Sequence, residues 1–304
     1  MATFILRRIL FLLPVLFFVA LMTFVLMHVT PGGPWDREKP LSPAAVANLN
    51  AKYHLDLPPP QQFLLYVWDA LHGDFGPSYT HPDESVADII KSGIGITAQL
   101  GAFAFLFALA FGLPLGVLAA LRHNRLGDYA AMFAAVFGYS IPNFVLATFG
   151  IVLFAAVWHL LPTGGWDSWK AWILPPIALG LGPAAAVARY TRASMLDVIR
   201  QDYVRTSRAK GLRELVVVRR HEVKNALLPV VTVLGPTVAY LVTGSFVVET
   251  IFHIPGIGTN FVDSILARDY PLIMASVLLY ATAVAVANLL VDLSYAVLDP
   301  RIRY

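Results

Sequence analysis

Long apolar runs alternate with shorter polar stretches along most of this 304-residue chain. An apolar run of about 20 residues is long enough to cross a bilayer as a helix. The pattern predicts six spans, at about Ile9–Val29, Thr97–Leu121, Tyr129–Leu160, Ala171–Ala188, Leu227–Val248 and Pro271–Leu298. The third run is longer than one span needs, and Pro142 predicts a break within it. We therefore expect an all-α polytopic membrane protein with six transmembrane helices.

The region between the first two spans has a different character. Thr30–Ser92 is polar and rich in proline and glycine, and it holds two helix-like pieces. Ser42 is placed to cap a helix over Ala44–Tyr53, and a second helix is expected over Gln61–Leu71. Because apolar residues such as Phe63 need a surface to bury against, we expect a small extracytoplasmic domain and not a flexible linker.

Composition supports the membrane assignment. Hydrophobic residues make up 58% of the chain and charged residues only 13%, with a mean hydropathy of +0.67. A soluble domain carries roughly a quarter charged residues. The chain has no cysteine, which excludes disulfides and cysteine-ligated metals.

The distribution of basic residues predicts the orientation in the membrane. Six spans place both termini on one side, and that side would carry sixteen basic residues on the N-terminus, the 122–125 loop, the 189–224 loop and the tail. The opposite side carries six, which are Arg37, Lys39, Lys52, Lys91, Lys170 and Arg268. The positive-inside rule then predicts a multi-pass protein of the cell (inner) membrane with both termini in the cytoplasm.

One loop, between the fourth and fifth spans, holds ten of the 22 basic residues. They are Arg189, Arg192, Arg200, Arg205, Arg208, Lys210, Arg213, Arg219, Arg220 and Lys224. Such a loop would stay in the cytoplasm for its charge alone. It is longer and more patterned than topology requires, so we expect it to have a binding role as well.

The middle of this loop has features that suit binding to another protein and transmitting its movement. Gly211 can take a positive φ and turn the chain between two short helices, and Ala209 leaves room for another backbone. Leu212, Leu215 and Val216 share one helical face by their spacing. An apolar face with a basic surround fits a cleft on a cytoplasmic subunit. It equally fits a surface of anionic lipid headgroups, and the spacing alone leaves both open.

The chain carries no sign of its own energy source. There is no GxxxxGK[ST] phosphate loop, no HExxH, and no Cys/His cluster with metal-ligand spacing. Charges inside the predicted spans are nearly absent, Asp292 being the one acid well inside, while Glu249 and His28 are expected at the membrane interface. An ion-driven carrier usually needs such intramembrane charges. We therefore expect a non-catalytic membrane body that is driven from outside itself.

At the basic loop the sequence resembles a known family. The segments YVRTSRAKGL (Tyr203–Leu212), RRH (Arg219–His221) and NALLP (Asn225–Pro229) are similar to the cytoplasmic signature of ATP-binding-cassette importer permeases of the oligopeptide/dipeptide/nickel class. Further segments resemble the B-type permease subunit of oligopeptide importers, namely Arg7–Phe17, Thr30–Pro34, Ala51–Pro58, His72–Tyr79, Thr163–Trp166, Glu249–Gly258, Arg268–Pro271 and Asp299–Tyr304. Their order and spacing together are specific.

The resemblance implies a type I importer-like permease that forms a path for peptides, oligopeptides ahead of dipeptides or nickel. It implies a second homologous permease subunit, two cytoplasmic ATPase subunits that bind ATP and Mg, and an extracytoplasmic peptide-binding protein, all around a chain that lies in the lipid bilayer. This chain itself would bind no cofactor, metal or nucleic acid.

The resemblance also implies two sets of site residues. Coupling to the ATPase would fall on Arg205, Thr206, Ser207, Arg208, Ala209, Lys210, Gly211, Leu212 and Leu215. A loop that faces the binding protein or gates the path would contain Glu249, Pro255, Gly256 and Gly258, or would be a compact surface loop only. The general importer signature begins Glu-Ala-Ala, whereas Arg205-Thr206-Ser207 stands here, so the contacts of that glutamate do not transfer.

These expectations give a division of the chain and two competing hypotheses. The first transmembrane helix takes residues 1–29, the extracytoplasmic domain 30–95, and the permease core 96–304, with the coupling loop at 189–226. An ion-coupled secondary carrier would use Asp292 and keep the basic loop as a topology signal only. A membrane scaffold without transport would bind a partner that hydrolyses nothing. Neither explains the ordered run of similar segments.

Overall fold

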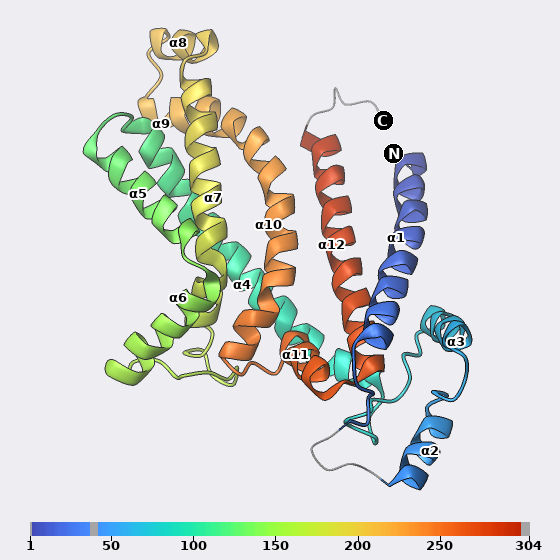
Figure 1. Cartoon of the computed structure of the whole chain (residues 1–304). Coiled ribbons are helices and arrows are strands. Elements are labelled where there is room, and N and C mark those ends of the chain that lie inside the picture. Colours follow the sequence, from blue (N-terminus) through green and yellow to red (C-terminus); the bar gives the residue numbers. More distant parts are fainter. Residues whose placement is uncertain (1, 37–41, 299–304) are drawn as a thin grey trace. The chain divides into compact units, whose positions relative to one another are not determined.

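The computed structural model describes residues 2–36 and 42–298, and its regular elements there are helices (Figure 1). In chain order they are α1 (Ala2–Val29), α2 (Pro43–Lys52), α3 (Pro59–Leu71), α4 (Val86–Leu121), α5 (Leu126–Ser140), α6 (Asn143–Gly150), η1 (Ile151–Val157), α7 (Leu174–Ile199), α8 (Asp202–Ala209), α9 (Glu214–Val217), η2 (Val218–Val223), α10 (Lys224–Ile251), α11 (Ile257–Ala267) and α12 (Tyr270–Leu298). The two η segments are π-helical. The all-α prediction is confirmed. The expected tail, residues 299–304, and the side chain of Asp292 lie outside the described residues.

Four of the described helices are long and apolar enough to cross a membrane by themselves. They contain the segments Leu6–Val29, Val86–Leu121, Leu234–Ile251 and Tyr270–Leu290. A fifth candidate is the pair α5 and α6–η1, which bends by 98° between Ser140 and Asn143. The bend follows from Pro142, whose ring disfavours helical geometry at Ile141; that residue is extended, with φ −88° and ψ 124°. The predicted break is confirmed.

α7 corresponds to the predicted fourth span, but its composition is different from that of the four apolar helices. It contains Pro175, Pro176 and Pro183, and it continues to Ile199, so that Arg189 and Arg192 lie on the helix and not in the loop that the sequence predicted. α7 packs against α5, α6 and α10. A helix that faces protein on most sides does not need the uniform apolar surface of a lipid-exposed helix.

The chain divides into two compact units, each of which is described by itself. Unit 1 comprises Met1–Thr97 with Pro255–Ala285, and unit 2 comprises Ala98–Ile254 with Val286–Tyr304.

In unit 1, the polar region after α1 is folded onto the helices. Ser42 caps α2 by accepting a hydrogen bond from the backbone N–H of Ala45, as its sequence predicted. Phe63 of α3 is buried with Ala20 of α1 and Met274 of α12. The apolar face of α3 therefore packs on membrane-type helices.

A buried carboxylate holds the start of α12 in unit 1. Asp269 is fully buried, and its Oδ2 accepts hydrogen bonds from the hydroxyl of Ser78, the hydroxyl of Thr80 (2.8 Å) and the backbone N–H groups of Tyr79 (3.0 Å) and Thr80 (3.2 Å). Its Oδ1 faces the backbone N–H of Leu272 at 3.3 Å. Asp269 thus fixes the segment before α4 to the first turn of α12, about 190 residues away in sequence.

In unit 2, α4 and α7 lie in close contact along a seam of small residues. A Cβ on Gly112 would lie 2.6 Å from the carbonyl oxygen of Ala184, and one on Gly116 would lie 2.5 Å from that of Ala188. No side chain fits at those distances, so glycine is required for this approach of the two backbones. Small residues at helix contacts are the usual way that membrane helices gain packing area.

We expect Asp269→Asn to loosen unit 1. Asparagine has one acceptor oxygen where Asp269 has two, and it carries no charge. In either orientation its amide nitrogen faces a backbone N–H that it cannot bond, and each buried donor left without a partner costs about 1–3 kcal/mol. The thermal midpoint of the detergent-purified protein should fall, and proteolysis between residues 72 and 85 should become faster. The control is Asp263→Asn, on the exposed face of α11. Equal thermal midpoints for the two variants would contradict the structural role of Asp269.

Candidate functional site

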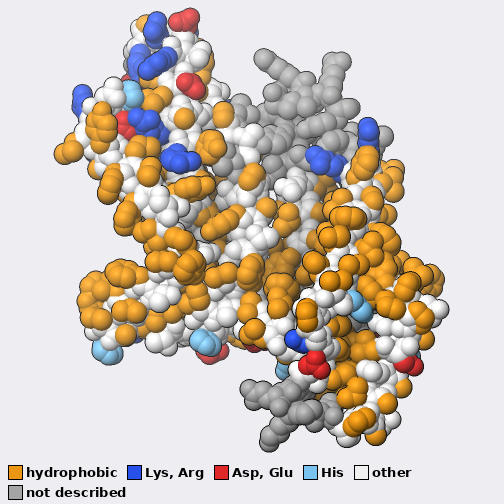
Figure 2. Space-filling view, in the orientation of Figure 1, with side chains coloured by type: hydrophobic (Ala, Val, Ile, Leu, Met, Phe, Trp, Pro, Cys, Tyr) orange, Lys and Arg blue, Asp and Glu red, His pale blue; other side chains and the backbone are white. Residues whose placement is uncertain are grey.

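The candidate site is the basic hairpin, which we define as residues 202–223 and which contains α8, α9 and η2. It connects the end of α7 to the start of α10. In Figure 1, α8 lies beyond the C-terminal end of α7, at one end of unit 2. Figure 2 shows Lys and Arg side chains gathered at that end. The predicted coupling residues therefore lie on a protruding element of the fold.

α8 forms because its short sequence is amphipathic and its charges suit the helix dipole. Asp202 lies in the first turn and Arg208 in the last. Val204 and Ser207 are buried on the inner face, whereas Thr206 is exposed on the outer one. Of the predicted coupling residues, Ser207 thus has an internal role, and its hydroxyl donates to the carbonyl of Tyr203 at 2.8 Å.

Gly211 makes the turn between α8 and α9, as the sequence predicted. Its φ is +76°, which only glycine adopts without strain. Its N–H donates to the carbonyl of Arg208 (2.9 Å), and Lys210 donates to Thr206 (3.0 Å), so the turn closes the end of α8. A Cβ added at Gly211 would meet no atom within 4 Å. The turn therefore presents an open backbone surface.

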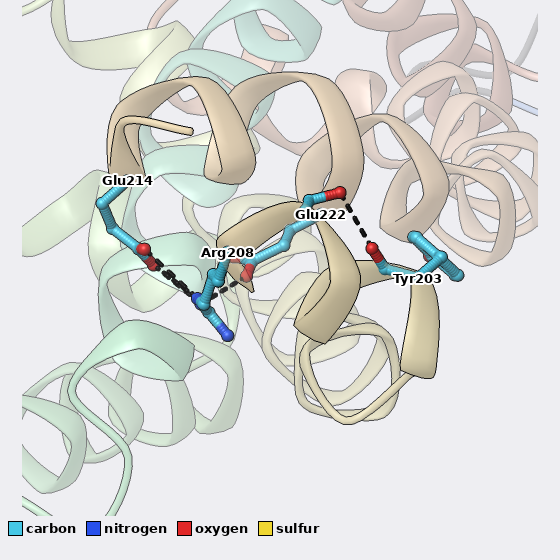
Figure 3. Close-up of polar contacts among 5 residues, drawn as sticks. Tyr203, Arg208, Glu214 and Glu222 are labelled. Atoms are coloured by element: carbon cyan, nitrogen blue, oxygen red, sulfur yellow. Dashed lines mark hydrogen bonds and ion pairs between the residues drawn. The ribbon is translucent and has the colours of Figure 1, made fainter. Parts of the chain in front are cut away.

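Arg208 ties the two arms of the hairpin together (Figure 3). Its Nη2 donates to Glu214 Oε1 at 2.7 Å and to Glu222 Oε1 at 2.8 Å, and its Nε lies 3.2 Å from Glu214 Oε2. The guanidinium comes from the end of α8, and the two carboxylates come from α9 and η2. The turn at Gly211 is thus closed by a charge-assisted network that spans it.

The two carboxylates occupy different environments. Glu222 is fully buried, and burial raises its pKa while the Arg208 charge opposes that rise. Glu214 is exposed, and its hydrogen bonds to Arg208 lower its pKa. The Oε2 atom of Glu222 makes no hydrogen bond within the described part of the chain. Arg208 is therefore the group that favours the charged form of Glu222 against the effect of burial.

The outer surface of the hairpin combines apolar and basic side chains. Leu215 is 67% exposed and Leu212 is 41% exposed. Arg205, Ala209, Lys210 and Arg213 are exposed around them. The predicted helical face of Leu212, Leu215 and Val216 is wrong in detail, because α9 begins only at Glu214 and Val216 is half-buried. The hairpin nevertheless exposes Leu212 and Leu215 together with several basic side chains, and Asp202 and Glu214 are exposed among them.

The base of the hairpin is fixed to the helices of unit 2. Met195 of α7, Ala120 of α4 and Ala226 of α10 form one buried cluster. The hydroxyl of Ser194 donates to the carbonyl of Ala226 at 2.8 Å, and Asn225 donates to the hydroxyl of Tyr203 at 3.1 Å. Because α7 and α10 are bonded to each other here, a force on the hairpin acts on both.

The second predicted set is not one exposed loop. Glu249, expected at the membrane interface, lies inside α10 and is fully buried in unit 2. Pro255, Gly256 and Gly258 belong to unit 1, where Gly256 precedes α11 and Gly258 is buried in its first turn. The segment expected as a polar loop is largely the helix α11, and only Pro255 of the set is exposed.

One polar pairing is not predicted by the sequence, in which Arg192 is expected in a loop. Arg192 Nε donates to Asp128 Oδ1 at 2.6 Å and Nη2 to Oδ2 at 2.7 Å. Asp128 is buried at the start of α5 and also accepts from the N–H of Asn124. An acid directly after the basic 122–125 turn was the available signal. The pair fixes α7 to α5.

No group of three or more His, Cys, Asp or Glu side chains in the described ranges is arranged to hold a metal ion. The hairpin has an exposed contact surface, and its base packs against α4, α7 and α10, the last two of which are bonded to each other.

Comparison with known proteins identifies the kind of chain. The family model described as "Binding-protein-dependent transport system inner membrane component" matches residues 112–304. The dipeptide transport system permease protein DppB of Bacillus subtilis is 46% identical over 303 residues, which is 100% of this chain and 98% of that protein. The oligopeptide transport system permease protein OppB of Escherichia coli (strain K12) is 44% identical over 306 residues, with 100% of both chains covered.

Solved structures of ABC transporters have a similar fold. An inward facing conformation of the MetNI methionine ABC transporter aligns with a TM-score of 0.59 at 19% identity, over 69% of this chain and 96% of that one. An amino acid ABC transporter aligns with a TM-score of 0.54 at 15% identity, over 68% of this chain and 93% of that one. This chain is a multi-pass membrane protein with an ABC transporter permease fold, and it belongs to the binding-protein-dependent transport system inner membrane component family.

Proposed function

We propose that this chain is the transmembrane subunit of an ATP-driven importer and forms part of the path that peptides take through the membrane. The main support is that relatives named for dipeptide and for oligopeptide transport align with the whole chain at 44–46% identity. The two names occur at nearly equal identity, so the peptide length is not set by this comparison. Our preference for oligopeptides remains a prediction.

We further propose six membrane crossings with both termini in the cytoplasm. The five candidate spans become six when α7 is counted, and the burial of α7 among α5, α6 and α10 supports counting it. The bias of basic residues toward the loops on one side supports the orientation. The region 30–95 then forms the extracytoplasmic part between α1 and α4.

The basic hairpin is the proposed coupling element. It exposes Leu212, Leu215 and several basic side chains. No atom lies close to the Cβ position of Gly211, and Ser194 at the base of the hairpin bonds α7 to α10. These features suit docking into a cleft of a cytoplasmic ATPase. The proposed complex contains two such ATPases, which bind ATP and Mg, a second homologous permease subunit and an extracytoplasmic peptide-binding protein.

Cross-linking tests the docking directly. The chain has no cysteine of its own, so Ala209→Cys places a single thiol on the exposed side of α8. In the purified complex we expect this thiol to cross-link to an ATP-hydrolysing subunit. The matched control is Asp263→Cys on α11, which the proposed topology places on the opposite side. Cross-links from position 209 to lipid alone would contradict the proposal.

The turn at Gly211 gives a second test. Valine is strained at a φ of +76°, whereas asparagine tolerates this conformation better. We expect Gly211→Val to lower ATP-driven peptide uptake several-fold in proteoliposomes while ATP hydrolysis continues, and Gly211→Asn to retain more uptake. Normal uptake by the valine variant would argue against the role. Uptake that survives ATP depletion would instead support an ion-coupled carrier.

The Arg208 network predicts a rescue. Arg208→Gln leaves the buried Glu222 carboxylate without its counter-charge, and breaking a buried pair in this way costs about 3–5 kcal/mol. The partial exposure of Arg208 places the expected cost toward the lower end. Trypsin should then cleave the hairpin faster. The double variant Arg208→Gln with Glu222→Gln removes the orphaned charge and should regain most of the resistance; equal cleavage of single and double variants would refute the coupling.

A further inference from the structure

Unit 2 contains a cavity of about 460 Å³ at the bend between α5 and α6, which α7 and α10 also line. Cavities of about 300–1,000 Å³ are the usual size of small-molecule sites. The lining residues that carry polar groups are Tyr139, Asn143, Arg189, Tyr190, Thr237 and Tyr240. Residues of the bend and of the middle of two long helices meet here, so the cavity lies at the level of the proposed membrane-crossing segments.

The cavity is rich in hydrogen-bond donors and has no acidic side chain in its lining. Arg189 lies over the ring of Tyr139, with its Cζ 4.9 Å from the ring centroid. Among the described residues, no carboxylate lies within ion-pair distance of Arg189. The neighbouring arginine on α7, Arg192, has a buried carboxylate partner, so the two arginines of this helix differ in role.

Arg189 is exposed and comes directly after the predicted fourth span, which ends at Ala188. An arginine that lines a cavity at the end of a membrane span, without a carboxylate partner among the described residues, is a reasonable candidate for ligand binding. The guanidinium offers a planar fork of donors that matches a carboxylate. The side chain of Asn143 makes no hydrogen bond within the described chain and adds further donor capacity on the same wall. A ligand that binds to Arg189 and Asn143 must therefore offer hydrogen-bond acceptors, and an anionic group suits the arginine best.

We propose that this cavity binds the terminal carboxylate of a peptide in transit, with Arg189 as the residue that receives it. The inference rests on the proposed function. Every unmodified peptide has this group whatever its sequence, so an arginine that binds it can serve many substrates. Tyr139, Tyr190 and Tyr240 line the same cavity, and aromatic rings suit varied side chains by apolar contact.

The test compares two peptides in proteoliposomes that contain the complete importer. One peptide has a free C-terminal carboxylate and the other is its C-terminal amide, and both are supplied at saturating binding protein. The variants are Arg189→Gln, Arg189→Lys and the control Arg125→Gln, which removes an exposed arginine outside the cavity. The measured quantity is the ratio of the two ATP-dependent uptake rates.

We expect the unmodified importer and Arg125→Gln to favour the carboxylate peptide by about tenfold, the factor that one charge-assisted contact provides. Arg189→Gln should bring the ratio close to one, and Arg189→Lys should restore part of it. A ratio unchanged by Arg189→Gln would overturn the proposal; this is the result expected if Arg189 binds an acidic residue of the second permease subunit or a lipid phosphate. No ATP-dependent uptake of either peptide by the unmodified importer would instead refute the proposed function.

A second measurement keeps the proposal testable if Arg189→Gln does not assemble. Leu146→Cys places the only thiol of this chain in the cavity wall. Peptides whose C-terminal residue is cysteine activated as a 2-pyridyl disulfide should react with this thiol during ATP-driven turnover, forming the mixed disulfide and releasing 2-thiopyridone, more readily than peptides with the activated cysteine at the N-terminal position. C-terminal amidation should remove that preference. Equal labelling by both peptides, or a preference that survives amidation, would overturn the proposal.

Discussion

The contact between α4 and α7 constrains the rest of unit 2. At Gly112 and Gly116 the two helices approach until the space for a Cβ is gone, with carbonyl oxygens of α7 at 2.5–2.6 Å from where that atom would be. Such a contact tolerates little sliding or rotation, because close-packed interiors transmit displacement and do not absorb it. The position of α7 decides where Arg189 lies in the cavity and where the chain leaves the helix for the basic hairpin.

The polar pairs of α7 and the hairpin follow from this constraint. Arg192 bonds to the buried Asp128, and Ser194 bonds to the carbonyl of Ala226. These bonds fix α7 to α5 and to α10 at positions C-terminal to Ala188, where the glycine contacts end. Within the hairpin, Arg208 reaches both Glu214 and the buried Glu222. Since a buried carboxylate without its partner is strongly destabilising, the network specifies one geometry for the turn. The exposed Leu215 on α9 is thereby held in a fixed position relative to α8 and η2.

Local signals in the sequence were enough to predict much of the fold and part of the site. Ser42 as a cap, Pro142 as a break and Gly211 as a turn depend on the conformational preferences of single residues, and the structure confirms each. Pairings across long separations were not predictable. Asp269 with Ser78 and Arg192 with Asp128 join segments 191 and 64 residues apart. The position of Asp128 after the basic 122–125 turn marks it as an acid of interest, but no local pattern identifies the partner of either acid. Glu249 lies two residues before the end of α10, as hydropathy predicts, but only packing shows that its side chain is buried in the protein.

The same limit explains why the sequence alone predicts Arg189 in a loop. A charge at the end of an apolar run marks the end of a span in sequence, and only the helix itself shows that α7 continues to Ile199. From Arg189 to Ile199 the helix rises by about 15 Å, at about 1.5 Å per residue. One helix therefore connects the cavity to the hairpin, with Arg192 and Ser194 bonded to neighbouring helices between them. A displacement of the hairpin large enough to move α7 must also move Arg189, so the proposed substrate contact and the proposed coupling surface are connected by one continuous helix.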